Sequence, residues 1–307
     1  MLIEKLDEPI RPGPHSRVRY KLAGHISEIF WSTHKSRGGC IKRFDKDHFV
    51  DMRTGELREF QHFENRAQSL SSVARSLAQG RDMLNANVTD VRNCRWVTLT
   101  YRENMQNPKK LLFDFQNFNK RLRSLYGHYE YVTAAEPQAR GAWHLHVVMI
   151  FPGPAPYIPN DVMANAWKQG FVTVKRLDDV DNVGAYLTAY LGDLDLSEAT
   201  TWQKRHTRGL KEVEVEIDGN MVTKRYIKGG RLHLYPPGMH IFRWSKGVKK
   251  PTVEYIEAGQ VSDKVSGQLT FEKTVSLLDE VTGFKSILNY RYYNTKRLDT
   301  KQDKSID

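Results

Sequence analysis

The sequence contains few cysteines and no long apolar run. Cys40 and Cys94 are the two cysteines among 307 residues, which argues against the disulfide scaffold of small secreted domains. No apolar stretch reaches the roughly 20 residues that a membrane-spanning helix needs. Residues 1–8 mix acidic and apolar side chains, unlike the basic and then apolar order of a signal peptide. From these absences we expect a folded, cytoplasmic protein that does not act at a membrane.

A nucleotide-binding loop and an excess of acidic residues are also missing. The sequence has no Gly-x-x-x-x-Gly-Lys-[Ser/Thr] pattern, so we expect no P-loop motor within it. Against 47 Lys and Arg stand 36 Asp and Glu, and the net charge is +11. Such a surface attracts polyanions, because each cation that meets a phosphate releases condensed counterions. The composition is compatible with a nucleic-acid partner but does not establish one.

Two histidines occur in a run that has the character of a β-strand. In Trp143–Phe151, His144 and His146 are two positions apart, so a strand directs both imidazoles to the same face. This spacing is typical of one half of a metal site. The alternative is a half-exposed sheet face that happens to contain two histidines.

A carboxylate precedes this pair at hairpin distance. The segment His128–Glu136 also has strand character, and the turn-forming residues 137–141 join it to the next strand. If Glu136 lies opposite Ala142 or His144, its side chain falls on the imidazole face. A shift of the register by one residue would remove it.

Two tyrosines stand four positions apart in a predicted helix. Residues 181–191 begin with acidic and amide side chains, which favour a helix start. Tyr186 and Tyr190 lie one above the other on such a helix, so both hydroxyls can reach one point. The alternative is an aromatic stripe that packs against a sheet, which is the commoner role of tyrosine at this spacing.

The order of these motifs resembles that of the HUH (His-hydrophobic-His) endonucleases, in the two-tyrosine branch of rolling-circle replication initiators from phages and plasmids. The resemblance spans residues 94–191 and begins with a threonine-rich motif, Thr98-Leu99-Thr100-Tyr101. It departs from the family pattern at Ala189, where a lysine usually precedes the second tyrosine. Candidates for replacing that lysine at the substrate phosphate are Lys175, Arg176, Lys204 and Arg205.

The resemblance implies metal-dependent nicking and joining of single-stranded DNA. His144, His146 and Glu136 would bind a divalent ion, and the family favours Mg²⁺ or Mn²⁺. Tyr186, followed by Tyr190, would attack a DNA phosphate and form a 5′-phosphotyrosine intermediate. Such an enzyme would initiate and terminate rolling-circle replication at a single-stranded or hairpin origin, together with a separate helicase and a host polymerase.

Other functions remain open at this stage. A conjugative relaxase or an HUH transposase would use the same chemistry. A non-catalytic protein could use the same histidines and tyrosines to stack the bases of single-stranded nucleic acid. A metal hydrolase with activated water would cleave without a tyrosine.

The pattern of elements predicts an α+β fold with helices on one face of an antiparallel sheet. The predicted order is βαββαβα, that of ferredoxin-like or RRM-like proteins, and the face opposite the helices should carry the metal. The predicted elements are a strand at 94–101, a helix from Asn107 to Gly127, the two hairpin strands, a helix at 160–169, a strand at 171–176 and the tyrosine helix.

The chain outside this core is expected to form β-rich additions. Residues 1–93 would be an accessory region with short strands and a helix at 59–84. Residues 94–195 would be the endonuclease core. Residues 196–307 would be a basic and aromatic extension, which is hairpin-rich around Asp218-Gly219-Asn220 and ends in a disordered tail.

The extension contains candidate DNA contacts. In residues 231–251 aromatic side chains alternate with cations, and a single-strand groove uses aromatics to stack bases and cations to hold phosphates. An edge hairpin with exposed basic residues would explain the same pattern. The candidate DNA-binding residues of the whole chain are Thr98, Thr100, Lys175, Arg176, Lys204, Arg205, Arg231, Arg243, Lys246, Lys249 and Lys250.

Overall fold

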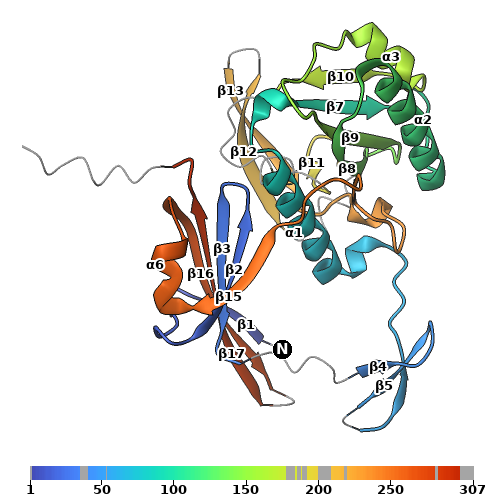
Figure 1. Cartoon of the computed structure of the whole chain (residues 1–307). Helices are drawn as coiled ribbons and strands as arrows, with labels where there is room; N and C mark the ends of the chain where they lie inside the picture. Colours follow the sequence, from blue (N-terminus) through green and yellow to red (C-terminus); the bar gives the residue numbers. More distant parts are fainter. Residues whose placement is uncertain are drawn as a thin grey trace, which may run out of the picture. The chain divides into compact units, whose positions relative to one another are not determined.

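The computed structural model of the chain is shown in Figure 1. It describes residues 2–34, 41–52, 54–177, 184, 188, 192–199, 209–217, 220–280 and 283–297. The chain forms two compact units, residues 63–250 and residues 1–62 together with 251–307. These limits differ from the expected boundaries after residues 93 and 195, because both ends of the chain contribute to one unit.

The unit of residues 63–250 is built on a five-stranded antiparallel sheet. Its strands are β7 (Cys94–Thr100), β8 (Glu130–Pro137), β9 (Trp143–Ile150), β10 (Val172–Lys175) and β14 (Phe242–Trp244). They lie in the order β10-β7-β9-β8-β14. With helices α2 (Pro108–Tyr126) and α3 (Asn160–Trp167), the chain order is β7-α2-β8-β9-α3-β10, which confirms the predicted α+β fold. Of the predicted tyrosine helix, the structure describes Gly184 and Thr188, and both are helical.

Helix α2 forms where its local sequence predicts it. The side chain of Asn107 accepts hydrogen bonds from the backbone N–H groups of Lys109 and Lys110, so it caps the helix start. Pro108 occupies the first turn, where its missing N–H costs no hydrogen bond. Gly127 ends the helix with φ 76°. The buried apolar stripe consists of Leu111, Phe115, Phe118 and Leu122.

Helix α3 is shorter than its sequence suggests. It ends at Trp167, because Lys168 adopts a left-handed conformation with φ 63°. Gly170, the predicted stop, serves another purpose. A Cβ atom there would lie 2.5 Å from the backbone oxygen of Thr100 and the backbone nitrogen of Arg102. The chain can therefore pass the end of β7 closely only with glycine at this position.

Helices cover the two faces of this sheet to different extents. On one face, Phe115 of α2 packs edge-on against Tyr131 at a ring distance of 5.0 Å, and Phe118 contacts Trp167 of α3 at 6.0 Å. Helix α1 (Leu70–Asn87) approaches the other face, where a Cβ atom on Gly80 would lie 2.6 Å from the ring of Phe242. The prediction of helices on one face thus describes α2 and α3, while α1 covers part of the opposite face near β14 and β8.

A buried phenol and carboxylate join β7 to α2. The Tyr101 hydroxyl donates to Asp114 Oδ2 at 2.8 Å, and Lys110 Nζ donates to the same oxygen at 2.8 Å. Burial and the Asp114 contact raise the pKa of Tyr101, so the phenol remains protonated. We expect Tyr101→Phe to lower the free energy of unfolding by about 1–2 kcal/mol, because the buried carboxylate loses one donor.

Urea denaturation would measure this change. The matched control is Tyr157→Phe, because Tyr157 is 82% exposed in the same unit, and it should change the free energy of unfolding by less than about 0.5 kcal/mol. Equal stability of the two variants would contradict the prediction.

The second unit contains a six-stranded antiparallel sheet. Its strands are β1 (Leu2–Leu6), β2 (Arg17–Ala23), β3 (Ile26–Ser32), β15 (Thr252–Glu257), β16 (Gln268–Asp279) and β17 (Phe284–Asn294). They lie in the order β1-β16-β17-β3-β2-β15. A small core packs on one face of this sheet and includes the helix α6 (Val261–Lys264). Its buried residues are Val18, Tyr20, Ile29, Ile256 and Val261.

Two three-stranded sheets complete the described structure. One consists of β4 (Ile41–Arg43), β5 (His48–Asp51) and β6 (Leu57–Glu59). Because β6 and a loop precede α1, this helix begins at Leu70 rather than at the predicted residue 59. The other sheet contains β11 (Leu194–Asp195) and the hairpin of β12 (Leu210–Ile217) and β13 (Asn220–Ile227). Ile217 pairs with Asn220, which confirms the predicted hairpin.

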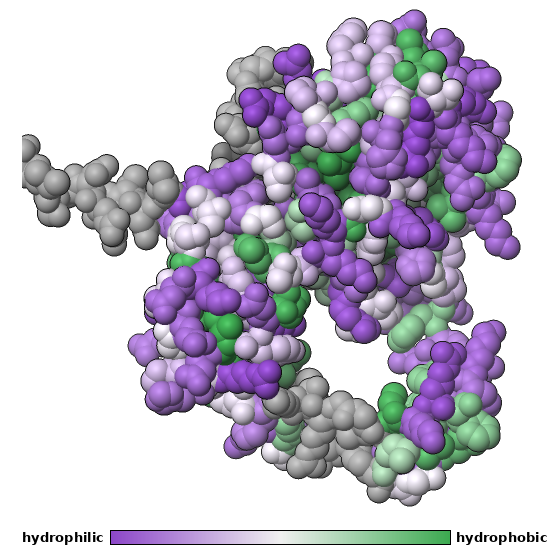
Figure 2. All heavy atoms as spheres, in the orientation of Figure 1, coloured by the Kyte–Doolittle hydropathy of each residue, from purple (hydrophilic) through white to green (hydrophobic). Residues whose placement is uncertain are grey.

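The described surface mixes polar and apolar side chains. Figure 2 shows hydrophobic residues scattered among a larger number of hydrophilic ones on the face in view. Among the described residues, none of the helices combines the length and the apolar character that a bilayer crossing requires.

Candidate active site

The candidate site lies on the sheet face that α2 and α3 leave uncovered. His144 of β9 pairs with Glu136 of β8 and with Thr100 of β7, and His146 pairs with Thr98. Residues that pair across neighbouring strands project to the same face. The structure thus has one of the two predicted registers, the one with Glu136 opposite His144.

Both ring nitrogens of His146 have partners. Nε2 lies 2.8 Å from Glu136 Oε2, and Nδ1 lies 3.1 Å from Thr98 Oγ1. The ring of Trp96 is 6.1 Å away on the same face. Both the imidazole and the Glu136 carboxylate are largely shielded, with 22% and 15% of their side chains exposed. Thr98 and Glu136 therefore fix the orientation of His146.

His144 differs from His146 because one of its ring nitrogens is uncommitted. Its Nε2 is buried and has no hydrogen-bond partner among the described residues. Burial, followed by the charges of His146 and Arg231, lowers the pKa of His144 to about 4, although Glu136 acts in the opposite direction. The ring is therefore neutral at pH 7, and a neutral imidazole nitrogen is a good metal ligand.

An arginine from outside the 94–195 segment enters the site. Arg231 Nη1 lies 2.8 Å from Glu136 Oε1, and Nη2 lies 3.4 Å from Glu198 Oε2. Its side chain is 16% exposed, so its partners and the surrounding protein hold it in place. Arg231 is one of the residues predicted to contact DNA, and its position beside the histidines gives that prediction a specific location.

Two acidic residues at this site were not predicted from the sequence. Asp193 accepts a hydrogen bond from the Gly229 N–H at 2.8 Å. Burial raises the pKa of Asp193, and the charge of Glu136 acts in the same direction. Glu198 is the second partner of Arg231. The signal in the sequence was the acidic run that directly follows the predicted tyrosine helix.

The chemistry of these residues fits a divalent ion. One carboxylate and two imidazoles on a single face are ligands that Mn²⁺ and related ions accept, and the orphaned, neutral Nε2 of His144 is the strongest indication of such a site. Among the described residues, no three His, Cys, Asp or Glu side chains already have the arrangement of a metal centre. Glu136 and His146 contact each other directly, so they would have to separate to share an ion.

The remaining predicted DNA contacts occupy different places. Lys175 pairs with Trp96 at the exposed edge strand β10, on the histidine face, and Arg176 follows it. Arg243 pairs with Thr133, which places it on the opposite face. Lys246, Lys249 and Lys250 are exposed in the segment after β14. Four predicted site residues lie outside the described part of the chain: Tyr186, Tyr190, Lys204 and Arg205.

The comparisons with known proteins bear on this same segment. Residues 94–195 match a family model for the replication-associated protein ORF2 and its relatives. A search of curated proteins found no match to the chain. The matched segment begins with β7, contains Glu136 and both histidines, and ends with β11. Residues 94–195 are thus similar to the replication-associated proteins of the ORF2 family, and this similarity supports a role for the protein in the initiation of replication.

Proposed function

We propose that this protein nicks and rejoins single-stranded DNA at a replication origin, through a tyrosine ester and with a divalent ion on Glu136, His144 and His146. The observation that carries the proposal is the pairing of Glu136 with His144 beside His146 on an uncovered sheet face. The match to the ORF2 family supports DNA as the substrate. A relaxase or a transposase would share the chemistry, and the match favours replication over either.

The proposed reaction conserves the energy of the phosphodiester bond. The Tyr186 hydroxyl attacks the phosphorus, the bond to the 3′-oxygen breaks, and the 5′-phosphate stays on the tyrosine. A 3′-hydroxyl can later attack this ester, which reseals the strand and restores the tyrosine. Tyr190 provides a second nucleophile while the first is occupied, as the termination of a replication round requires.

The residues of the sheet face prepare this reaction. An ordinary tyrosine hydroxyl has a pKa of about 10, so its attack at pH 7 needs stabilisation of the charge that develops. When bound, a divalent ion supplies Lewis-acid polarisation of a non-bridging phosphate oxygen. Thr98 orients His146 through Nδ1, and such contacts to a ligand raise metal affinity.

Arg231 is the cation best situated to replace the lysine that is missing at Ala189. It lies against Glu136, and a guanidinium can hold two phosphate oxygens at once. Arg231→Ala is expected to slow single-turnover nicking by about a hundredfold, whereas Arg231→Lys should recover part of the rate. The control is Arg75→Ala, which removes an exposed cation of α1 and should leave the rate unchanged. Equal rates for Arg231→Ala and the wild type would contradict this role.

Adduct formation tests the proposed function as a whole. The protein is incubated with Mn²⁺ and a labelled single-stranded hairpin from its own replicon, and the products are separated under denaturing conditions. We expect a labelled protein band that EDTA prevents. Binding without any adduct would favour a non-catalytic DNA-binding protein. Cleavage that persists when both tyrosines are phenylalanine would instead indicate a metal hydrolase.

A further inference from the structure

A row of aromatic and basic side chains crosses the six-stranded sheet of the unit formed by residues 1–62 and 251–307. Tyr255 of β15 pairs with Arg19 of β2, which pairs with Phe30 of β3. Phe30 pairs with Tyr290 of β17, which pairs with Lys273 of β16. Paired residues share one face of a sheet, so these five side chains form a continuous line, here named the aromatic–basic row.

Neighbours in the row contact each other. The Arg19 guanidinium carbon lies 4.9 Å from the centroid of the Phe30 ring, and the rings of Phe30 and Tyr290 are 4.9 Å apart. Arg17, two positions along β2, lies 4.9 Å from the centroid of the Tyr255 ring. Cations packed on aromatic faces hold those rings in fixed orientations, so the row is preorganised for stacking.

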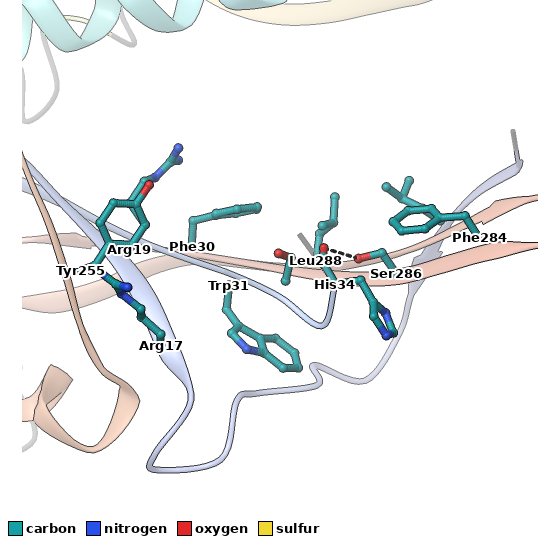
Figure 3. A pocket seen from close by; sticks show the side chains of 11 residues that line it. Arg17, Arg19, Phe30, Trp31, His34, Tyr255, Phe284, Ser286 and Leu288 are labelled. Carbon is teal, nitrogen blue, oxygen red and sulfur yellow. Dashed lines mark hydrogen bonds between the residues drawn. The ribbon is translucent and has the colours of Figure 1, made fainter. Parts of the chain in front are cut away.

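This face of the sheet is hollowed and accessible. A hollow of about 650 Å³ is lined in part by Arg17, Arg19, Phe30 and Tyr255, and Figure 3 shows Phe30 and Trp31 leaving β3 on opposite sides of the sheet. Tyr255 is 61% exposed. The core of the unit lies on the face of Val18 and Ile29 instead, so the row is not needed to form that core.

The charges near the row favour an anionic ligand. Glu28 lies 2.5 Å from Arg19 and 2.6 Å from Lys21. Burial raises the pKa of Glu28, but these two cations outweigh burial and hold the pKa below its usual value. One carboxylate thus offsets one of two cations. Arg17 and Lys273 make no ion pair within the described part of the chain, so their charges are available to a ligand.

We propose that this face binds a short stretch of single-stranded DNA, with bases stacked on the aromatic side chains of the row and phosphates held by Arg17 and Lys273. Aromatic platforms interleaved with cations bind single strands, because every unpaired base offers a flat face and every nucleotide carries a charge. A duplex hides its base faces and cannot use such a row. The proposal goes beyond nicking, since it involves neither the metal ligands nor the tyrosine nucleophiles.

Binding by the full chain tests the row. A fluorescent single-stranded oligothymidylate is titrated in EDTA, so that no cleavage occurs, and anisotropy gives the Kd. Tyr255→Ala should weaken binding by about tenfold, as the loss of one stacking platform does. The control Tyr157→Ala removes another largely exposed tyrosine, which lies in the other unit, and should leave the Kd unchanged. Equal Kd values for Tyr255→Ala and the wild type would overturn the proposal.

Two further measurements make the assignment specific. An oligonucleotide with 5-iodouracil, irradiated in the complex, should crosslink to peptides of β3, β15 or β17, and crosslinks confined to residues 63–250 would overturn the proposal. Arg17→Gln should reduce the slope of log K against log salt by about 0.7, and an unchanged slope would count against the row. An RNA of the same length that binds tenfold more tightly would reassign the face to RNA.

These results are separable from the proposed nicking activity. If both proposals hold, Tyr255→Ala forms the covalent adduct at the wild-type rate once DNA is saturating. A wild-type protein that binds through the row but forms no adduct would contradict the nicking proposal alone. Adduct formation without crosslinks to the row would contradict the row alone.

Discussion

Tyr186→Phe is expected to abolish the covalent protein–DNA adduct, with a loss of at least about a thousandfold in its rate of formation. Removal of a nucleophile costs catalysis at least this much when no other group can take its place. The phenyl ring keeps the size and the helix propensity of the residue, so the variant should fold normally. The measurement is single-turnover adduct formation with Mn²⁺ and a labelled origin hairpin.

Tyr190→Phe is the matched variant for this test. It removes the same atom one helical turn later, and it should retain the first cut while losing the second cut made by an enzyme already attached to DNA. A substrate with two cleavage sites separates these events. If both single variants keep the first adduct at the wild-type rate, Tyr186 is not the first nucleophile.

His144→Ala is expected to lower the affinity for Mn²⁺ by at least about a hundredfold, and to lower nicking with it. His144 contributes a neutral, buried nitrogen without a partner among the described residues. Loss of such a ligand should cost more than the roughly 10- to 100-fold that supporting residues contribute to metal sites. Calorimetric titration with Mn²⁺ measures the affinity without reference to activity.

Two further variants calibrate the His144 result. Thr98→Val removes the contact to His146 Nδ1 and should weaken Mn²⁺ binding by about 10- to 100-fold. His128→Ala removes an exposed histidine that contacts Glu130 on the loop before β8, and it should leave Mn²⁺ affinity unchanged. An unaltered affinity in a folded His144→Ala variant would refute the metal site.

The sequence predicts those elements whose signals are local. Asn107 and Pro108 mark the start of α2, and its buried stripe follows helical spacing. The hairpin that holds Glu136 and His144 spans few residues, so its register could be narrowed to two options before one was observed. Local chemistry was sufficient for these features, because turn and cap residues determine them.

The features that were not predicted depend on residues far apart in the chain. Arg231 contacts Glu136 across 95 positions, and its neighbourhood in the sequence shows only a basic and aromatic run. The pairing of β2 with β15 and of β3 with β17 joins the two ends of the chain. No turn links these strands, so local patterns cannot identify their partners.

The pairing of β17 with β3 and of β15 with β2 has a consequence for biosynthesis. Residues 63–250 contain every strand of their own five-stranded sheet, so that unit can fold while the ribosome is still translating. Strands β2 and β3 must wait, with unsatisfied edges, until residues 251–294 have emerged. Unpaired edges invite aggregation, so the early-made strands are where we expect a chaperone to act on the nascent chain.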